Sequence, residues 1–299
     1  MKLKILTAAD RRVFDRFLKL KEHQLSVYAF ENIYIWKQLY KIRWQIVNNS
    51  LCVFFSDPLG TFMYLPPLAD KLDPQVLREC FRVMDRLNRN KEASRIENVE
   101  EVESKTFRRL GYMPKDKFCD YLCLRRDLSD LKGNSYKPQR ASFNFFTKNY
   151  KFEYLPFSVR YRGQCMDLYG RWAESRRQKK QDPIYRMMIE DSRRSLKVLL
   201  NEYGYLHCQG RIVKVDGKIS AFTFGFRLNS NTFCILYEIT DLSRKGLAQF
   251  IFRKFCRELV DFRYINIMDD SGLANLKKVK LSFRPRRLVK NYIIKRSDG

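Results

Sequence analysis

The 299-residue sequence has no apolar run long enough to cross a lipid bilayer. A membrane-spanning helix needs about 20 predominantly apolar residues, and the most apolar candidate, residues 33–47, is interrupted by three basic residues. The first residues also lack the apolar core of a signal peptide, because charged residues follow from Asp10 onward. We therefore expect a cytoplasmic protein, and in that compartment its eight cysteines should be free thiols.

Acidic residues are scarce relative to basic ones. The chain has 33 Asp and Glu against 59 Lys and Arg, a net charge of +26, and residues 271–296 contain nine basic residues and no acid. This excess is more than solubility requires and indicates a polyanionic partner. The candidates are tRNA or another nucleic acid, acidic lipid head groups in peripheral contact, and a phosphorylated cofactor. The alternative is a basic surface that is only solvated.

Metal-binding and nucleophile patterns are also missing. Cys119 and Cys123 share one face of a predicted strand, but no second pair of Cys or His completes a tetrahedral metal site. His207 and Cys208 are adjacent on a predicted strand, so their side chains face opposite ways and cannot form a nucleophile-base pair. We expect no metal and no tightly bound cofactor.

The sequence contains two halves with the same order of predicted elements, which indicates an internal duplication. In each half a helix ends at a small residue and an aromatic residue, and a strand follows, at 107–124 and again at 279–294. The predicted elements of the first half are helices 8–21 and 29–39, strands 42–47, 51–55 and 61–65, helix 74–88, strand 95–99, a helix ending at 110 and strand 118–125. Those of the second half are a helical region 162–203, strands 212–215, 220–226 and 232–239, helix 245–260, strand 264–268, helix 272–281 and a final strand.

A cluster of Gly, Asn, Ser and Pro at residues 131–138 has the composition of a domain connection, and an amphipathic stretch follows at 140–150. The sequence thus predicts an N-terminal domain at 1–130, a linker and connecting helix at 131–150, and a C-terminal domain at 151–299. Both domains are expected to be of α/β (α+β) class, with mixed sheets flanked by helices.

One candidate phosphate site lies where a predicted strand gives way to a helix. Arg244 and Lys245 precede Gly246 and Ala248 at the start of this helix. A helix N-terminus directs backbone N–H groups outward, and the two basic side chains would add to its attraction for a phosphate. The alternative is that Gly246 only eases the turn from strand to helix.

Three acids are candidates for chemistry. Glu238 lies inside an apolar predicted strand, so its carboxylate must face a cleft, a partner or solvent. Asp269 and Asp270 follow the end of another strand and could recognise an amine or act as a general base. Alternatively, they cap the helix that is predicted to begin at Gly272.

The second half resembles the Gcn5-related N-acetyltransferase fold, whose phosphate-binding motif is Gln or Arg, two residues, Gly, one residue, and Gly or Ala. This chain keeps Gly246 and Ala248 and has Ser243 in the first place. The whole chain is similar to the bacterial domain family of unknown function related to the C-terminal part of phosphatidylglycerol lysyltransferase, and more distantly to the Fem peptidyltransferases. The segments that carry this resemblance are His23–Ser26, Tyr64–Leu68, Arg140–Phe146, Asp269–Leu273 and Lys280–Pro285.

The resemblance implies an acyl or aminoacyl transferase with two tandem domains, an aminoacyl-tRNA or acyl-CoA co-substrate, and an amine or hydroxyl acceptor at a cleft between the domains. It also implies that Lys280, with Arg284 beside it, is the partner of the oxyanion or phosphate. An equally open interpretation of Lys280 is a lysine that satisfies the carbonyl groups at a helix end. The alternative function is a non-catalytic protein that binds nucleic acid or acidic lipid head groups.

Overall fold

A computed structural model describes residues 2–179 and 182–296, which form two compact units. Unit 1 contains residues 1–121, 269–278 and 288–299, and unit 2 contains residues 122–268 and 279–287. Within the described residues, no helix is both long and apolar enough to cross a membrane.

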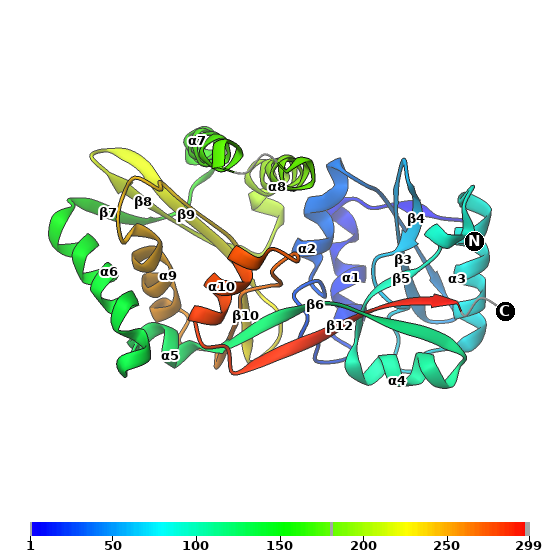
Figure 1. Cartoon of the computed structure of the whole chain (residues 1–299). Coiled ribbons are helices and arrows are strands. Elements are labelled where there is room, and N and C mark those ends of the chain that lie inside the picture. The colour runs from blue at the N-terminus through cyan, green and yellow to red at the C-terminus, as the bar shows by residue number, and fades with distance from the viewer. Residues whose placement is uncertain (1, 180–181, 297–299) are drawn as a thin grey trace. The chain divides into compact units, whose positions relative to one another are not determined.

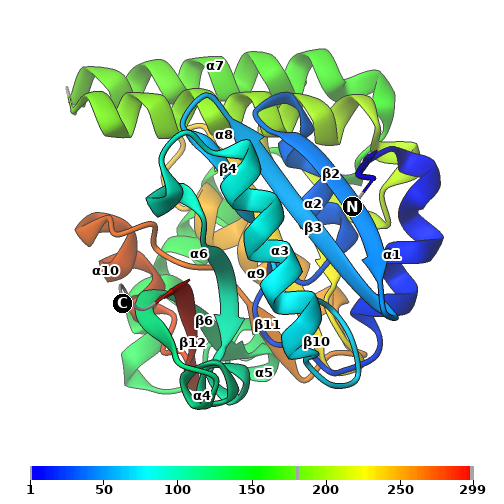
Figure 2. The ribbon, with the colours of Figure 1, turned by 90° about the vertical axis from the view of Figure 1, so that its right-hand side faces the viewer.

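Unit 1 is a mixed sheet in the order β1-β2-β3-β4-β5-β12-β6. Its strands are β1 (Lys4–Ile5), β2 (Lys41–Val47), β3 (Ser50–Asp57), β4 (Gly60–Met63), β5 (Ile96–Glu100), β12 (Arg287–Arg296) and β6 (Tyr112–Leu124). Its helices are α1 (Arg11–Leu18), α2 (Phe30–Tyr34), α3 (Pro74–Leu87) and α4 (Glu101–Arg109). Figure 2 shows α3 lying across β3. There, buried residues of α3 pack on Phe54, Met63 and Ile96 of the sheet.

Unit 2 has the strand order β6-β11-β10-β9-β8-β7. The strands are β7 (Phe152–Pro156), β8 (Cys208–Val215), β9 (Lys218–Arg227), β10 (Thr232–Thr240) and β11 (Tyr264–Asn266), together with the last residues of β6. The helices are α5 (Arg125–Asp130), α6 (Lys137–Asn149), α7 (Arg162–Lys179), α8 (Pro183–Asn201) and α9 (Leu247–Glu258), and α10 (Ala274–Ser282) is divided between the units.

In unit 2, α6 and α9 lie side by side (Figure 1). Phe146 of α6 and Phe250 of α9 pack with Val213, Val215 and Ala221 of the β8–β9 hairpin. Burial of each large apolar side chain stabilises the fold by about 1.5–3 kcal/mol. The turn of this hairpin is made by Asp216 and Gly217, both at positive φ, as is typical of an Asp-Gly hairpin turn. The amphipathic face of α6 is thus a packing face.

The units differ from the domains expected from the sequence. The chain passes from unit 1 to unit 2 within β6, between Tyr121 and Leu122, and the final strand β12 belongs to unit 1 rather than to the second half. There β12 pairs antiparallel with β5, while residues 122–124 of β6 pair antiparallel with β11. Each sheet is therefore completed by the last strand of the other half of the chain. The expected connecting segment 131–150 contains α6, which is part of unit 2.

Candidate active site

Strand β10 continues well beyond the end of its parallel neighbour β11, which pairs with only its first three residues. Residues 232–234 pair with residues 264–266, but β11 ends at Asn266 and β10 continues to Thr240. The pairing of β10 with β9 also shifts between Ile235 and Tyr237. Such irregularities bend a strand and redirect its side chains, and they are frequent beside active sites.

Glu238 lies in the part of β10 that continues beyond β11. The residue as a whole keeps partial exposure, but its Oε2 is buried and has no hydrogen-bond partner among the described residues. Burial disfavours the charged form and raises the pKa of Glu238 from 4.5 to about 8. A carboxyl group with such a pKa exchanges its proton close to neutral pH, which suits a general acid or base.

Lys280 is buried at α10, and its Nζ donates a hydrogen bond to the backbone carbonyl of Ile267, the residue after β11. Electrostatic interactions link Lys280 to the thiol of Cys123, and Glu238 to the thiol of Cys256. Cys123 and Cys256 also interact with each other. Glu238 thus lies near Cys256 and Lys280 near Cys123, all within unit 2, and Lys280 anchors the end of β11.

Burial sets the protonation state of Cys123 and Cys256. It raises the pKa of Cys123 to about 12, against the opposing effect of Lys280. It also raises the pKa of Cys256 well above its usual value, and the negative charge of Glu238 adds to this effect. Both thiols are therefore protonated at neutral pH and are poor nucleophiles.

Asp269 and Asp270 lie in unit 1, whereas Glu238 and Lys280 lie in unit 2. The Oδ1 of Asp269 accepts hydrogen bonds from the backbone N–H and the hydroxyl of Ser271, at 2.7 and 3.1 Å. The buried carboxylate of Asp270 accepts from the Gly272 N–H at 2.9 Å and from the Tyr121 hydroxyl at 2.5 Å. Both acids therefore hold the turn before α10, which begins at Ala274 and not at Gly272 as expected.

Gly246 adopts a left-handed conformation, with φ +84°, at the N-terminus of α9. A Cβ atom there would lie 2.1 Å from the carbonyl oxygen of Ser142 in α6. The neighbouring basic side chains are also engaged: Arg244 binds Asp216 at 3.1 Å, and the Nζ of Lys245 lies 4.7 Å from the centre of the Phe145 ring. The space at Gly246 is therefore filled by α6.

The two remaining residues expected at the phosphate site have few features of a binding group. Ala248 is half-buried in the first turn of α9. Arg284 is exposed just after α10 and also has a positive φ, of 53°. Among the residues that the structure describes, no three His, Cys, Asp or Glu side chains gather as a metal site would require.

Comparison with known families places the whole chain. Residues 18–295 match the family model described as phosphatidylglycerol lysyltransferase, C-terminal. The chain belongs to this family. The resemblance drawn from the sequence is therefore confirmed, and the family and the fold support a transferase function of acyl or aminoacyl type. The comparison with curated proteins gives no match.

Solved structures show how far the fold of this lysyltransferase-family chain is shared. A conserved protein of unknown function from Bacteroides thetaiotaomicron is 27% identical, with a TM-score of 0.86, over 98% of this chain and 99% of that one. L-PGS from Bacillus licheniformis is 15% identical, with a TM-score of 0.65, over 97% and 93% of the chains. FemX is 10% identical, with a TM-score of 0.60, over 98% and 97%. The expected α/β fold, with mixed sheets flanked by helices and a likeness to N-acetyltransferases, is confirmed.

A buried polar network in unit 1 was missed in the sequence. The carboxylate of Glu100 accepts hydrogen bonds from the backbone N–H groups of Gln24 and Leu25 and lies 3.1 Å from His23 Nδ1, and Asp120 accepts from the Ser26 N–H at 2.6 Å. Burial raises the pKa of Glu100, but these hydrogen bonds outweigh it and lower the pKa overall. The network fixes residues 23–26, one of the segments that carry the family resemblance. The signals that could have revealed it were one acid inside a predicted strand, Asp120, and one directly after another, Glu100.

Proposed function

We propose that this lysyltransferase-family protein is an aminoacyltransferase that moves an aminoacyl group from aminoacyl-tRNA to an amine or hydroxyl acceptor, with Glu238 as the general base. The observation that carries the proposal is the buried, unpartnered Oε2 of Glu238, with a pKa of about 8, on the part of β10 that β11 leaves uncovered. The match to a lysyltransferase family supports the reaction class.

The reaction requires one proton transfer and stabilisation of one negative charge. The acceptor nitrogen or oxygen attacks the ester carbonyl of the aminoacyl group while Glu238 takes the acceptor's proton. The resulting tetrahedral oxyanion collapses, the ester C–O bond breaks, and the proton passes to the departing ribose oxygen. In this proposal Lys280 holds the Ile267 carbonyl at the end of β11 and supplies positive charge to the site.

Two features favour tRNA over acyl-CoA as the donor. The net charge of +26 and the acid-free basic segment 271–296 suit a polynucleotide. At the start of α9, by contrast, the carbonyl group of Ser142 lies 2.1 Å from where a Cβ atom of residue 246 would stand, so α6 packs directly against the turn that would hold an acyl-CoA phosphate. The alternative donor places an acyl-CoA phosphate against Arg244, Lys245, Gly246, Ala248 and Arg284.

The test is transfer of label by the purified full-length chain. Bulk tRNA charged with labelled amino acids, and separately labelled acetyl-CoA, would be incubated with a mixture of amine and hydroxyl acceptors that includes phosphatidylglycerol. We expect transfer from charged tRNA and a loss of about 10²–10⁴-fold in kcat for Glu238→Gln. Glu153→Gln removes a carboxylate from an exposed position on β7 and should retain full activity.

Each other outcome has a distinct meaning. Full activity of a folded Glu238→Gln variant would exclude Glu238 as the base. Transfer from acetyl-CoA alone would show that the donor is acyl-CoA and not aminoacyl-tRNA. Binding of tRNA without any transfer would favour the non-catalytic polyanion-binding function.

A further inference from the structure

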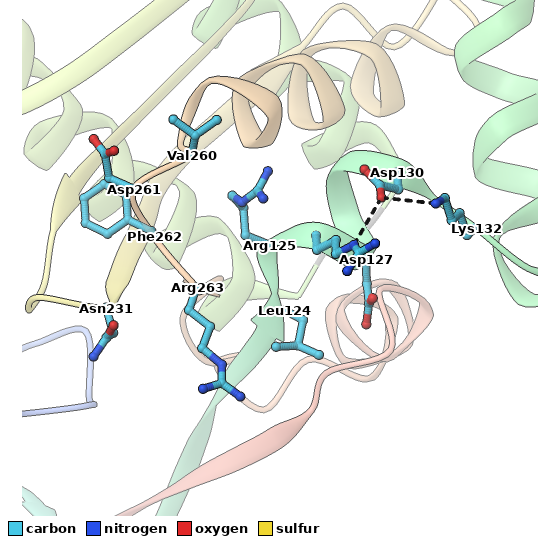
Figure 3. Close-up of a pocket in the computed structure, with 11 residues that line it drawn as sticks. Leu124, Arg125, Asp127, Asp130, Lys132, Asn231, Val260, Asp261, Phe262 and Arg263 are labelled. Carbon is cyan, nitrogen blue, oxygen red and sulfur yellow. Dashed lines mark ion pairs between the residues drawn. The ribbon is translucent and has the colours of Figure 1, made fainter.

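Unit 2 contains a cavity at the opposite end of β10 from Glu238. Its walls are the end of β6, helix α5, Asn231 just before β10, and residues 260–263 before β11 (Figure 3). Its volume is about 680 Å³, within the ~300–1,000 Å³ of typical small-molecule sites. None of the residues assigned to the transfer reaction lines it.

The cavity wall has more basic than acidic groups. Four basic residues line it, Arg125, Arg126, Lys132 and Arg263, together with three acids, Asp127, Asp130 and Asp261. One of these acids, Asp130, is shared by two cations, at 3.6 Å from Arg126 and 3.9 Å from Lys132. The cavity lining therefore has a net positive charge.

Arg125 gives the clearest sign of an absent ligand. Its Nη1 lies 3.4 Å from the Ser129 hydroxyl, but its Nε is buried and has no hydrogen-bond partner among the described residues. A buried charged donor without an acceptor is costly, and an anion is the group that offsets this cost best. Figure 3 places Arg125 between Val260 and Phe262 on one side and Asp130 on the other.

Backbone hydrogen bonds hold the cavity walls together. The Arg125 N–H donates to the carbonyl of Arg263 at 3.0 Å, and the Arg263 N–H donates to the carbonyl of Asn231 at 3.0 Å. Behind α5, the guanidinium groups of Arg253 and Arg257 donate to the carbonyl of Ser129. These two arginines add positive charge next to the wall, so the cavity is preformed and electropositive.

We propose that this cavity binds a small phosphorylated molecule about the size of a mononucleotide. Its phosphoryl group accepts hydrogen bonds from Arg125 and Arg263, and its apolar or aromatic part contacts Leu124, Val260 and Phe262. The site is separate from the proposed transfer site and does not depend on that function.

The test is calorimetric titration of the full-length chain at physiological salt with adenosine 5′-monophosphate, with inorganic phosphate and with adenosine. We expect saturable binding of the monophosphate, weaker binding of phosphate and none of adenosine. Arg125→Met and Arg263→Met should each weaken binding by about 10-fold or more, because each removes charge-assisted hydrogen bonds. Arg171→Met, on the exposed face of α7, removes the same charge elsewhere and should leave the affinity unchanged.

Arg263 is exposed, so its variant keeps the test decisive if Arg125→Met fails to fold. Equal binding of adenosine and the monophosphate, or an equal loss in Arg171→Met, would overturn the proposal. A dissociation constant for the monophosphate weaker than about 1 mM would also overturn it.

Discussion

At the scale of single residues, Glu238 links the stability of the fold to pH. Burial raises its pKa from 4.5 to about 8, so between these values the folded state holds a proton that the unfolded state has released. The free energy of unfolding then falls as pH rises across this window, by up to about 1.4 kcal/mol per pH unit. Glu238→Gln cannot ionise, so it should not lose this stability. The urea midpoint of the variant minus that of the wild type should therefore increase from pH 4.5 to 8 and stay constant above pH 8.

The matched control is Glu153→Gln, whose midpoint should follow that of the wild type at every pH because the residue is exposed on β7. If the difference between the wild type and Glu238→Gln stays constant from pH 4.5 to 8, the carboxyl group is not held neutral by burial.

The sequence predicts some features of the candidate site residues but not their hydrogen bonds. An acid within an apolar strand identifies Glu238 as unusual, because strand alternation leaves few ways to solvate it. Two hydrogen bonds could not be predicted: the one from Lys280 to the Ile267 carbonyl, and the one from the Tyr121 hydroxyl to the carboxylate of Asp270. Each depends on where a loop end comes to lie in three dimensions, which local periodicity does not encode.

At the scale of elements, the approach of α6 to α9 explains the glycine at the start of α9. Gly246→Ala combines a left-handed backbone with a Cβ atom 2.1 Å from the carbonyl oxygen of Ser142. Gly217→Ala, in the left-handed β8–β9 turn at φ +75° with nothing within 4 Å of the new Cβ atom in the described part of the chain, measures the backbone effect alone. We expect Gly217→Ala to lower the free energy of unfolding by about 1 kcal/mol, and Gly246→Ala by a further 1–3 kcal/mol because α6 must move.

Urea denaturation of the two variants provides the comparison. Equal losses would show that α6 does not press on Gly246, and the start of α9 would then be open to a phosphate after all.

Helix and strand positions were mostly predictable because their signals are local. The dipeptide Asp216-Gly217 is typical of the β8–β9 turn, and the spacing of apolar residues in 247–258 indicates the helix α9. The charged region 162–203 was expected only as helical, and it contains two helices. The second helix begins at Pro183, with Asp182 accepting a hydrogen bond from the Ile184 N–H, a start signal that was present in the sequence.

At the scale of the whole chain, the repeat predicted from the sequence does not reveal that the two halves exchange their last strands. The two halves have the same order of elements, so each final strand was expected to complete its own half. Instead, β12 pairs with β5 and the end of β6 pairs with β11. Both strands are similarly apolar and follow similar helices, so their sequences do not specify which sheet each one joins.

This exchange predicts that the chain cannot be divided at the linker. A fragment of residues 1–130 lacks β12 and leaves β5 without that neighbour, and a fragment of residues 131–299 lacks the part of β6 that pairs with β11. We expect neither fragment alone to unfold cooperatively in urea, because each has lost a strand that pairs with its sheet. Mixed and refolded together, the fragments should restore the far-ultraviolet dichroism and the cooperative transition of the intact chain. A chain cleaved only after folding, between residues 130 and 131, controls for the break itself and should keep that transition. A cooperative transition in the 1–130 fragment alone would show that β12 is dispensable for unit 1.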